Sequence, residues 1–391
     1  MSHAAMVIPG LDRMGGAERQ VMLLAKGLRQ RGWQVSMIAL SGTGDEAAAE
    51  LREAGVGFTS LAMRKGLADP RGWLRFHRWL WRERPDVVHA HLPHAAWLAR
   101  WSRLAAPVPV VIDTLHSSST GTWGRRVGYS VSRWLPDRVT AVSEAAAEAH
   151  CKAGMVRQRK LSPLANGIDG NLWRAEAGVR EDIRRALGLK NEFLWLAVGR
   201  LEPVKDYPTL LRAMAQAPRA ARLVVLGTGP LAGELQQMAS RLGLEQRVVF
   251  LGFEPQVIRW MQAADGLVLS SRLEGLPMVL LEAGACELPV VATDVPGTRE
   301  AVISGYTGWL ARPGDAASLT AAMERLMVAS MEERREVGAR ARSEVLRRFG
   351  LESVLDRWEQ LYTDLLERSR THPPVTFLAW EYLRRRSAIP A

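Results

Sequence analysis

The sequence of 391 residues lacks the features of a secreted or membrane-spanning protein. Its two cysteines, Cys151 and Cys286, are too few for a disulfide framework or a thiolate metal cluster. No apolar run approaches the ~18 residues that a membrane-spanning helix needs. Residues 1–10 have neither a basic region nor a small-residue cleavage site, so we interpret them as a strand rather than a signal peptide. These absences indicate a cytoplasmic protein.

Acidic residues are scarce in the first half of the chain. Residues 1–168 contain 23 Lys and Arg against 13 Asp and Glu, whereas residues 169–391 contain 29 against 28. A basic half beside a neutral half indicates an anionic partner, which can be a phosphorylated substrate, a membrane surface or a nucleic acid. No nucleic-acid-binding motif accompanies this charge, so we expect no nucleic-acid partner.

Short β-rich runs alternate with helical patterns along the chain, and the alternation starts again after residue 168. This pattern is typical of parallel sheets with helices on both faces. The sequence therefore predicts an α/β protein with two Rossmann-like, doubly wound domains, whose ligand lies at the carboxyl ends of the strands in a central cleft that both domains face. The expected strands are Ala5–Ile8, Gln34–Ala39, Asp86–His89, Val108–Asp113, Arg138–Val142, Phe193–Val198, Arg222–Leu226, Val248–Leu251, Gly266–Leu269 and Pro289–Ala292.

Turn residues just before and after residue 168 mark the join between the two domains. We assign residues 1–168 to an N-terminal domain and residues 169–365 to a C-terminal domain. The last expected helix begins at Leu351. We expect the tail of about residues 366–391 to pack back on the N-terminal domain.

The segment Ser270–Glu300 carries the strongest indication of a binding site. An expected strand leads into a loop that contains Glu274, and Glu282 lies eight residues further on. Pro277 is suited to the first turn of a helix between them, and the free N–H groups at such a helix start favour an anion. Two carboxylates beside a phosphate would serve hydroxyls on either side of one ligand. Alone, two Glu at this spacing also fit a solvated loop and a helix surface.

Two cations follow the first expected strand of the second half. Arg200 and Lys205 come directly after Phe193–Val198, at the carboxyl end of a strand, where α/β sheets form ligand sites. Arg can bind a phosphate through two hydrogen bonds, and Lys supplies a mobile point charge. Either residue alone would be interpreted as a solvated loop cation. An anionic ligand beside two carboxylates, however, needs such cations.

These segments resemble the retaining GT-B glycosyltransferases of family 4. The resemblance covers most of residues 5–365, in the order and spacing of the family. The segments that carry it are GRLEPVK (Gly199–Lys205), VLGTGP (Val225–Pro230), VVFLGF (Val248–Phe253), SSRLEGLPMVLLEA (Ser270–Ala283), PVVATDVPGTREAV (Pro289–Val302), PDVVHAHLPHAA (Pro85–Ala96), AVSEA (Ala141–Ala145) and NGID (Asn166–Asp169).

The resemblance implies a nucleotide-diphosphate-sugar donor bound by the second half of the chain. Glu282 would bind the ribose hydroxyls. Glu274 would hold the sugar, together with backbone N–H groups of Gly275 and Leu276. Arg200 and Lys205 would bind the diphosphate and stabilise the charge of the departing nucleotide.

The first half would bind a saccharide or lipid-linked acceptor, which implies bacterial polysaccharide or glycolipid biosynthesis. Gly15 and Gly16 open an expected helix and are similar to the family's glycine-rich loop near the diphosphate and acceptor. His116, in DTLHSS, matches the family's active-site histidine near the transferred sugar. The chain departs from the family at Gly284, at Glu287, where a turn glycine is usual, and at Pro296, where the family has the first of two glycines.

Three histidines, His89, His91 and His94, lie within six residues, but we expect no metal there. His89 is predicted to end a strand and the other two to lie in the following loop, so their side chains need not converge. An Asp-x-Asp motif is absent as well, and a diphosphate is already served by the cations and the helix start. We expect a metal-independent enzyme with no cofactor.

Residues 70–84 predict a helix with one basic face and one aromatic face. It is either an interfacial helix, peripheral at the inner face of a membrane, or a surface helix that packs its aromatic side on the sheet. Trp123, in a later loop, would extend the same membrane or acceptor surface. The basic face carries Arg71, Arg75, Arg78 and Arg82, and the aromatic face carries Trp73, Phe76 and Leu80.

Two other functions fit the same residues. A GT-B sugar-nucleotide epimerase or hydrolase would need no acceptor, and a degenerate protein would bind a nucleotide sugar without transferring it. The joint presence of Glu274, Glu282, Arg200, Lys205 and His116 favours the transferase. No carboxylate is an obvious nucleophile, so we expect substitution on the same face of the sugar, and we infer retention of configuration from the family.

Overall fold

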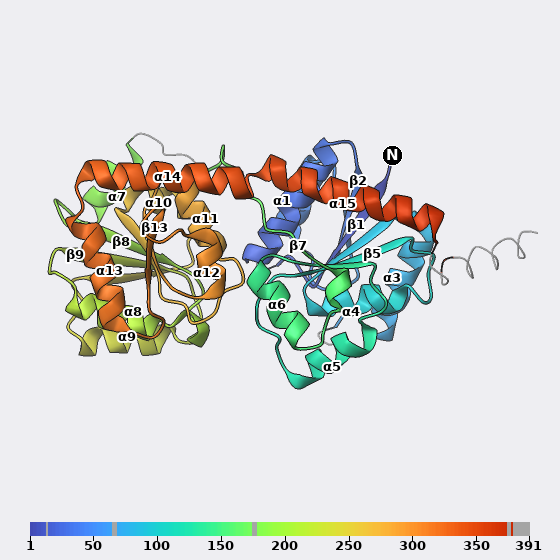
Figure 1. Ribbon diagram of the computed structural model, residues 1–391, viewed down its shortest axis with the longest axis horizontal. Coiled ribbons are helices and arrows are strands. Elements are labelled where there is room, and N and C mark those ends of the chain that lie inside the picture. Colours follow the sequence, from blue (N-terminus) through green and yellow to red (C-terminus); the bar gives the residue numbers. More distant parts are fainter. Residues whose placement is uncertain (13–14, 65–68, 174–177, 374–376, 378–391) are drawn as a thin grey trace, which may run out of the picture. The chain divides into compact units, whose positions relative to one another are not determined.

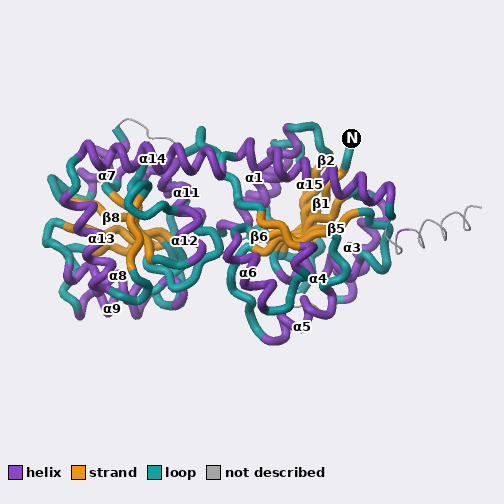
Figure 2. The backbone as a smooth tube through the Cα atoms, in the orientation of Figure 1, coloured by secondary structure: helices purple, strands orange, loops and turns teal. Residues whose placement is uncertain are grey.

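The computed structural model describes residues 1–12, 15–64, 69–173, 178–373 and 377. The chain divides into two compact units (Figures 1 and 2): unit 1 comprises Met1–Gly167 and the chain from Glu352 onward, and unit 2 comprises Ile168–Leu351. Each unit contains one parallel sheet with helices on both faces. The predicted pair of doubly wound α/β domains is therefore confirmed.

Unit 1 has a sheet of seven parallel strands in the order β3-β2-β1-β4-β5-β6-β7. Its strands are β1 (His3–Ile8), β2 (Gln34–Ala39), β3 (Gly57–Ser60), β4 (Val87–His91), β5 (Val110–Leu115), β6 (Arg138–Ala141) and β7 (Leu161–Pro163). Its helices are α1 (Gly16–Gln30), α2 (Asp45–Glu53), α3 (Pro70–Glu83), α4 (Pro93–Ser102), α5 (Trp123–Ser132), α6 (Glu144–Lys152) and α15 (Leu351–Thr371), with a 3-10 turn at Gln158–Lys160. In Figure 1, α1 and α15 lie on one side of this sheet, and α4, α5 and α6 lie on the other.

Unit 2 has a sheet of six parallel strands in the order β10-β9-β8-β11-β12-β13. Its strands are β8 (Phe193–Val198), β9 (Ala221–Leu226), β10 (Val248–Gly252), β11 (Gly266–Leu269), β12 (Val290–Thr293) and β13 (Gly308–Ala311). Its helices are α7 (Val179–Ala186), α8 (Tyr207–Gln216), α9 (Ala232–Arg241), α10 (Val257–Ala263), α11 (Met278–Ala285), α12 (Pro296–Ala301), α13 (Ala316–Val328) and α14 (Met331–Phe349), with a 3-10 turn at Pro203–Lys205. The central strands are buried on both faces, which explains why they form continuous apolar runs in the sequence.

The last helix moves the second domain boundary from residue 365 to Leu351. Helix α15 packs on α1, and a Cβ built on Gly27 would lie 2.6 Å from Leu355 Cδ1, so the two helices approach closely at that glycine. Arg31, at the end of α1, donates to Asp356 Oδ1 at 2.7 Å and to Glu359 Oε2 at 2.6 Å. The return to the first domain therefore begins earlier than residue 366. Residues 374–376 and 378–391 of the predicted tail lie outside the described residues.

A buried ion pair fixes α4 and α5 to the sheet of unit 1. Arg100 on α4 donates through Nε to Asp113 Oδ2 on β5 at 2.6 Å, and both residues are fully buried. The same guanidinium donates to Ser132 Oγ at 2.9 Å and lies 4.4 Å from the centre of the Tyr129 ring, both on α5. Burial raises the pKa of Asp113, and the Arg100 charge opposes that shift.

Candidate active site

The predicted donor residues of unit 2 lie at the carboxyl edge of its sheet, beside the point where the strand order reverses. Strands β8 and β11 are neighbours in the middle of the sheet; the chain continues outward from β8 to β10 on one side and from β11 to β13 on the other. Ligands of open α/β sheets bind at this reversal point. Lys205 lies in the connection after β8, and Glu274 lies in the connection after β11.

Lys205 and Glu274 form an ion pair at this edge. Lys205 Nζ donates to Glu274 Oε1 at 2.6 Å, and Ser271 Oγ donates to the same oxygen at 2.6 Å. The two charged side chains are only 21% and 11% exposed, so bulk water screens the pair less than it would a surface pair. An ammonium group has three N–H donors, and this bond uses one of them. The pair therefore presents a cation with remaining donor capacity, held in place before any ligand arrives.

Asp206 holds the backbone that carries Lys205. Its φ of 48° lies in the left-handed region, and its carboxylate is buried. Asp206 Oδ2 accepts from Thr209 Oγ1 at 2.9 Å and from Arg272 Nε at 2.9 Å, and Ser270 Oγ donates to the carbonyl of Lys205 at 2.8 Å. These bonds join the connection after β8 to the connection after β11. Sequence analysis missed this role of Asp206, and only the position of the aspartate just before α8 could have indicated it.

The loop that contains Glu274 packs against the start of α12 without room for a side chain. A Cβ on Gly297 would lie 2.3 Å from the carbonyl oxygen of Gly275 and 2.6 Å from that of Glu274. Pro296, by contrast, is exposed. Of the two glycines usual in the family at this place, the second is thus the one that this packing requires, which explains why proline is accommodated at the first.

The other predicted donor residues have different environments. Arg200 is 76% exposed and forms an ion pair with Glu202. The Leu276 side chain is buried, so only its backbone can face a ligand. Gly275 and Leu276 immediately precede Pro277, the N-cap of α11, and Glu282 lies half-buried within that helix. The structure therefore joins Lys205 to Glu274 directly and places the helix start predicted for the anion a few residues after Glu274.

In unit 1, the predicted histidine pairs with a second histidine. His116 directly follows β5, and its Nε2 lies 3.1 Å from Nδ1 of His91, the last residue of the neighbouring strand β4. His91 stacks on His89 with their ring centres 3.9 Å apart. His89 in turn hydrogen-bonds Tyr362 Oη on α15 at 2.6 Å and Thr114 Oγ1 at 2.6 Å. A row of polar groups thus connects α15 to His116, and burial lowers the pKa of the His89, His91 and His116 imidazoles, that of His116 to about 4.

The histidines that follow β4 differ in part from the prediction. The strand continues to His91, where the sequence predicted that it ended at His89, and His94 is an exposed residue in the first turn of α4 rather than in a loop. Among the residues that the structure describes, no group of three His, Cys, Asp or Glu side chains is arranged to hold a metal ion.

Gly15 and Gly16 open α1 as the sequence predicts. Gly15 is the N-cap, and its N–H donates to Glu18 Oε2 at 3.1 Å. Both glycines are exposed and follow β1, which lies next to β4 in the sheet. They therefore belong to the same carboxyl edge of unit 1 as His91 and His116.

Helix α3 buries its aromatic side and exposes its basic side. Phe76, Trp79 and Leu80 pack in the hydrophobic core, and Trp73 packs against it. Arg71, Arg75, Arg78 and Arg82 are exposed, as is Trp123 at the start of α5. The arrangement matches the interpretation of α3 as a surface helix packed on the core. No helix in the described part of the chain is both long enough and apolar enough to cross a bilayer.

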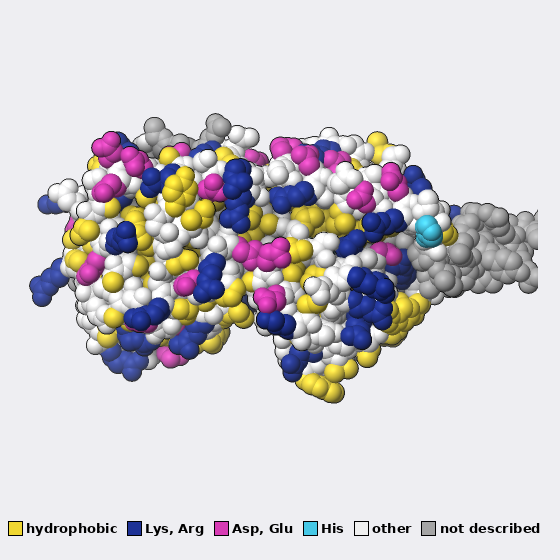
Figure 3. Space-filling model, viewed as in Figure 1, with side chains coloured by type: hydrophobic (Ala, Val, Ile, Leu, Met, Phe, Trp, Pro, Cys, Tyr) yellow, Lys and Arg dark blue, Asp and Glu magenta, His cyan; other side chains and the backbone are white. Residues whose placement is uncertain are grey.

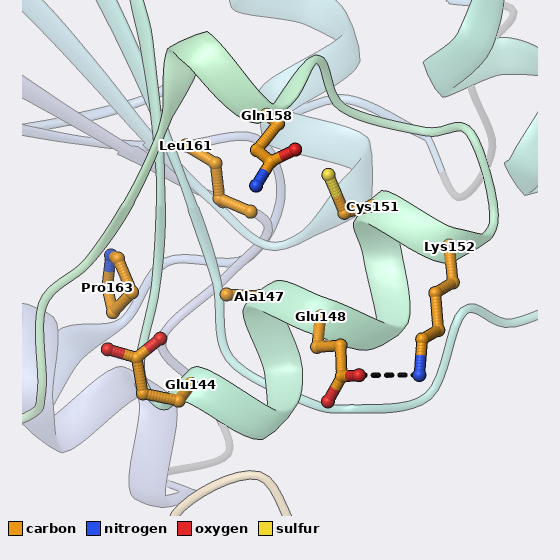
Figure 4. Close-up of a pocket in the computed structure, with 8 residues that line it drawn as sticks. All are labelled: Glu144, Ala147, Glu148, Cys151, Lys152, Gln158, Leu161 and Pro163. Atoms are coloured by element: carbon orange, nitrogen blue, oxygen red, sulfur yellow. Dashed lines mark ion pairs between the residues drawn. The ribbon is translucent and has the colours of Figure 1, made fainter.

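A separate cavity of unit 1 contains none of the predicted site residues. It has a volume of about 560 Å³ and lies beside α6 and β7 (Figure 4). Its rim carries the ion pair between Glu148 and Lys152, at 2.5 Å. The lining residues are Glu144, Ala147, Glu148, Cys151, Lys152, Gln158, Leu161 and Pro163.

Acid is expected to destabilise unit 1 through its buried histidines. The folded-state pKa of His116 is about 4, below the unfolded value near 6.5, so between these values the unfolded chain binds a proton that the folded chain does not. The contribution of His116 to the free energy of unfolding is therefore fully present above about pH 6.5 and decreases as the pH falls toward 4. At pH 5 the loss is about 1–2 kcal/mol.

Hydrogen exchange of peptides from β4 and β5 at pH 7 and pH 5, corrected for the intrinsic exchange rate, measures this loss. The same loss in a His116→Asn variant would show that the histidine is not its source.

Two family models match this chain. The model for glycosyl transferases group 1 matches residues 179–344, and the model for glycosyltransferase family 4 matches residues 14–171. The first match spans most of unit 2 and contains Lys205, Glu274 and Glu282. The second match covers most of the first segment of unit 1, Met1–Gly167, and contains His91 and His116.

Curated relatives are similar over most of their length. N-acetyl-alpha-D-glucosaminyl L-malate synthase of Bacillus anthracis is 29% identical over 303 residues, covering 73% of this chain and 76% of the relative. UDP-Gal:alpha-D-GlcNAc-diphosphoundecaprenol alpha-1,3-galactosyltransferase of Escherichia coli is 26% identical over 316 residues, covering 77% and 81%. The lipopolysaccharide core biosynthesis glycosyltransferase LpsE of Rhizobium meliloti is 27% identical over 351 residues, covering 89% and 95%.

Solved structures share the fold at low sequence identity. HepE of Anabaena in complex with UDP-glucose has a TM-score of 0.83 and 24% identity, covering 92% of this chain and 99% of that one. Sucrose-phosphate synthase of Thermosynechococcus elongatus has a TM-score of 0.79 and 22% identity, covering 94% and 100%. With the paired family models and the two parallel-sheet units, these findings show that the chain is a glycosyltransferase with the GT-B fold and belongs to glycosyltransferase family 4.

Proposed function

We propose that this chain is a retaining glycosyltransferase that moves a sugar from a nucleoside diphosphate sugar to a saccharide or lipid-linked acceptor. We also propose that it needs no metal ion. The observation that carries the proposal is the Lys205–Glu274 ion pair at the strand-order reversal of unit 2, next to the start of α11. It combines a fixed cation for a diphosphate with a fixed carboxylate for sugar hydroxyls.

The proposed chemistry depends on charge that develops on the leaving nucleotide. As the bond between the sugar and the diphosphate breaks, negative charge grows on the diphosphate, and a cation already in position stabilises it without reorganising. Lys205 supplies that cation, and the N–H groups at the start of α11 favour the same anion. These groups take the part that a metal ion would otherwise play, which supports the proposal of metal-independent transfer.

Two further residues complete the proposed donor and acceptor contacts. Glu282, in α11, binds the ribose hydroxyls. His116 faces the transferred sugar with a neutral ring, since burial lowers the pKa of its imidazole to about 4. A neutral imidazole can accept a hydrogen bond from a sugar hydroxyl at one nitrogen while the other donates.

The relatives support the choice of donor and acceptor. HepE of Anabaena is solved with UDP and with UDP-glucose, and the name of the Escherichia coli relative includes UDP-Gal as donor and a diphosphoundecaprenol-linked sugar as acceptor. A nucleoside diphosphate sugar fits the cationic edge of unit 2, and an anionic, lipid-linked acceptor fits the basic composition of residues 1–168.

Thermal unfolding with a panel of nucleotide sugars tests the donor. Binding to the native state alone raises the melting temperature, so one donor at about 100 times its Kd is expected to raise it by roughly 5–10 °C. Glu282→Ala is expected to lose at least half of this shift. Glu234→Ala, which removes an exposed glutamate on α9, should keep it. No shift with any nucleotide sugar, or an equal shift in both variants, would contradict the proposal.

A further inference from the structure

Helix α5 exposes a row of apolar side chains to solvent. Trp123, Val127 and Val131 are 73%, 38% and 53% exposed and follow one another at a spacing of four residues, which places them on one face of the helix. Trp134 is 50% exposed and follows directly after the C-cap of α5. A helix of a globular protein normally turns such a row toward the core.

The opposite face of α5 is firmly packed, so the exposed row does not arise from a loosely held helix. Tyr129 is 2% exposed and Ser132 is fully buried. Arg100, itself buried, donates to Ser132 Oγ and to the carbonyl of Tyr129, and α5 packs on α4. The fold thus fixes α5 with its apolar row outward.

Positive charge surrounds this row. No acidic residue occurs between Asp113 and Asp137, and Arg125, Arg126 and Arg133 are all exposed. The C-terminal end of α5 also contacts the basic segment 154–160, because Ser130 Oγ donates to the carbonyl of Gly154 at 3.1 Å and Lys160 Nζ donates to that of Trp134 at 2.8 Å. Figure 3 shows hydrophobic side chains at the surface over the tip of α5, with Lys and Arg side chains next to them.

A pocket opens at the N-terminal end of the same helix. It has a volume of about 300 Å³, and its lining combines cationic and aromatic side chains of α4 and α5. Arg125 and His94 supply the polar part, and Trp97 supplies an aromatic wall. Thr122 and Gly124, on either side of Trp123, also line it, so an anionic group bound there would lie beside the exposed apolar row.

We propose that the face of α5 formed by Trp123, Val127, Val131, Trp134, Arg125, Arg126 and Arg133, here called the α5 face, docks on an anionic lipid membrane. Tryptophan favours the boundary between headgroups and acyl chains, and a helix with an apolar row bordered by arginine is typical of interfacial membrane binding. Arginines near an anionic surface add attraction, and no acidic side chain of the helix opposes it. This inference rests on the proposed lipid-linked acceptor, which the α5 face would bring within reach of unit 1.

Helix α3 is the competing surface, and its structure argues against it. Its exposed arginines resemble those of α5 in number, but its aromatic side chains Phe76 and Trp79 are buried. The large apolar side chain that is exposed on α3 is Leu74, with an exposed fraction of 51%. The two helices therefore offer a matched comparison of the same charge with and without an exposed aromatic row.

Co-sedimentation of the full chain with lipid vesicles tests whether α5 or α3 binds the membrane. Wild-type protein is expected to bind vesicles of phosphatidylglycerol mixed with phosphatidylcholine, and to bind pure phosphatidylcholine vesicles much less. Arg126→Glu/Arg133→Glu is expected to weaken binding to the anionic vesicles by at least about tenfold. Arg71→Glu/Arg78→Glu changes the net charge equally on α3 and is expected to weaken binding by less than about threefold, because charges away from the contact are screened by salt.

A second pair of variants tests the apolar row. Trp123→Ser/Trp134→Ser is expected to lose at least about tenfold in binding, whereas Leu74→Ser on α3 is expected to bind as the wild type does. Melting temperatures of all variants, and the shift produced by nucleotide sugar, report whether folding and donor binding persist. Retained donor binding together with lost vesicle binding separates a failure of the α5 face from a failure of the proposed function.

Three outcomes would overturn the inference. The first is that the wild type does not bind anionic vesicles. The second is that the α3 charge reversal weakens vesicle binding as much as the α5 charge reversal does. Alternatively, size-exclusion chromatography could show a dimer that Trp123→Ser/Trp134→Ser dissociates without any change in vesicle binding. The last result would assign the α5 face to a second copy of the chain.

Discussion

Replacement of Lys205 by alanine is expected to lower kcat for sugar transfer by about 10²–10³-fold. It also leaves the Glu274 carboxylate, which is only 11% exposed, without its cationic partner, so the melting temperature is expected to fall as well. The expectation follows from the position of Lys205 at the strand-order reversal of unit 2, where its ammonium is held by Glu274. A fixed cation that meets developing negative charge acts mainly in the transition state, so kcat falls more than KM rises. Release of nucleoside diphosphate measures the rate.

The control for this prediction is Lys190→Ala, which removes an exposed lysine of unit 2 and should leave kcat unchanged. Glu274→Gln in the Lys205→Ala background extends the test. Because the two side chains act as one pair, their combined effect on kcat should be smaller than the product of the single effects. Independent, multiplicative losses would show that the ion pair is incidental to transfer.

Loss of the buried Arg100 guanidinium is expected to be the largest single effect on stability. Arg100→Ala leaves the Asp113 carboxylate fully buried without its partner, which typically costs about 3–5 kcal/mol. It also removes the bonds from Arg100 to α5. The loss in the free energy of unfolding of unit 1 is measured by unfolding the protein in urea and monitoring hydrogen exchange of peptides from β5.

The double variant Arg100→Met/Asp113→Leu separates charge from packing. Replacing both partners by apolar side chains removes the unpaired charge, so most of the lost free energy of unfolding should return. If the single variant lost less than about 1 kcal/mol, the buried ion pair would not be what fixes α4 and α5 to the sheet.

All central strands were predicted from the sequence, whereas three of the four edge strands were missed; the edge strand that was predicted is β10. All ten predicted strands are present with their ends shifted by at most two residues, because buried parallel strands appear as apolar runs. The strands missed are β3, β7 and β13, each at an edge of its sheet and partly exposed. Their sequences contain at most three consecutive apolar residues, so a local pattern does not reveal them.

The residues proposed to carry ligand chemistry were easier to find in the sequence than the residues that hold them in place. Lys205 and Glu274 were found through motif and loop position, and the structure brings them into contact. Asp206, Ser270 and His91 act through bonds between separate connections or strands. Such contacts depend on the strand order, which a local sequence pattern does not contain.

The structure also shows how the chain accommodates its departure from the family pattern at Glu287. Glu287 takes a φ of 58° at the end of α11, so a glutamate adopts the left-handed turn where the family has glycine. Gly338 on α14 lies against this turn, and a Cβ there would be 2.1 Å from the Glu287 carbonyl oxygen. The end of the helix that carries Glu282 is thus held by packing on α14 despite the missing turn glycine.

The most direct test of retaining transfer is the anomeric configuration of the product. The protein is incubated with the nucleotide sugar that stabilises it and with alkyl glycosides as acceptors, and the new glycosidic bond is analysed by proton NMR. The account predicts release of nucleoside diphosphate and a product with the same anomeric configuration as the donor. A product of opposite configuration, or a free epimerised sugar formed without an acceptor, would contradict it.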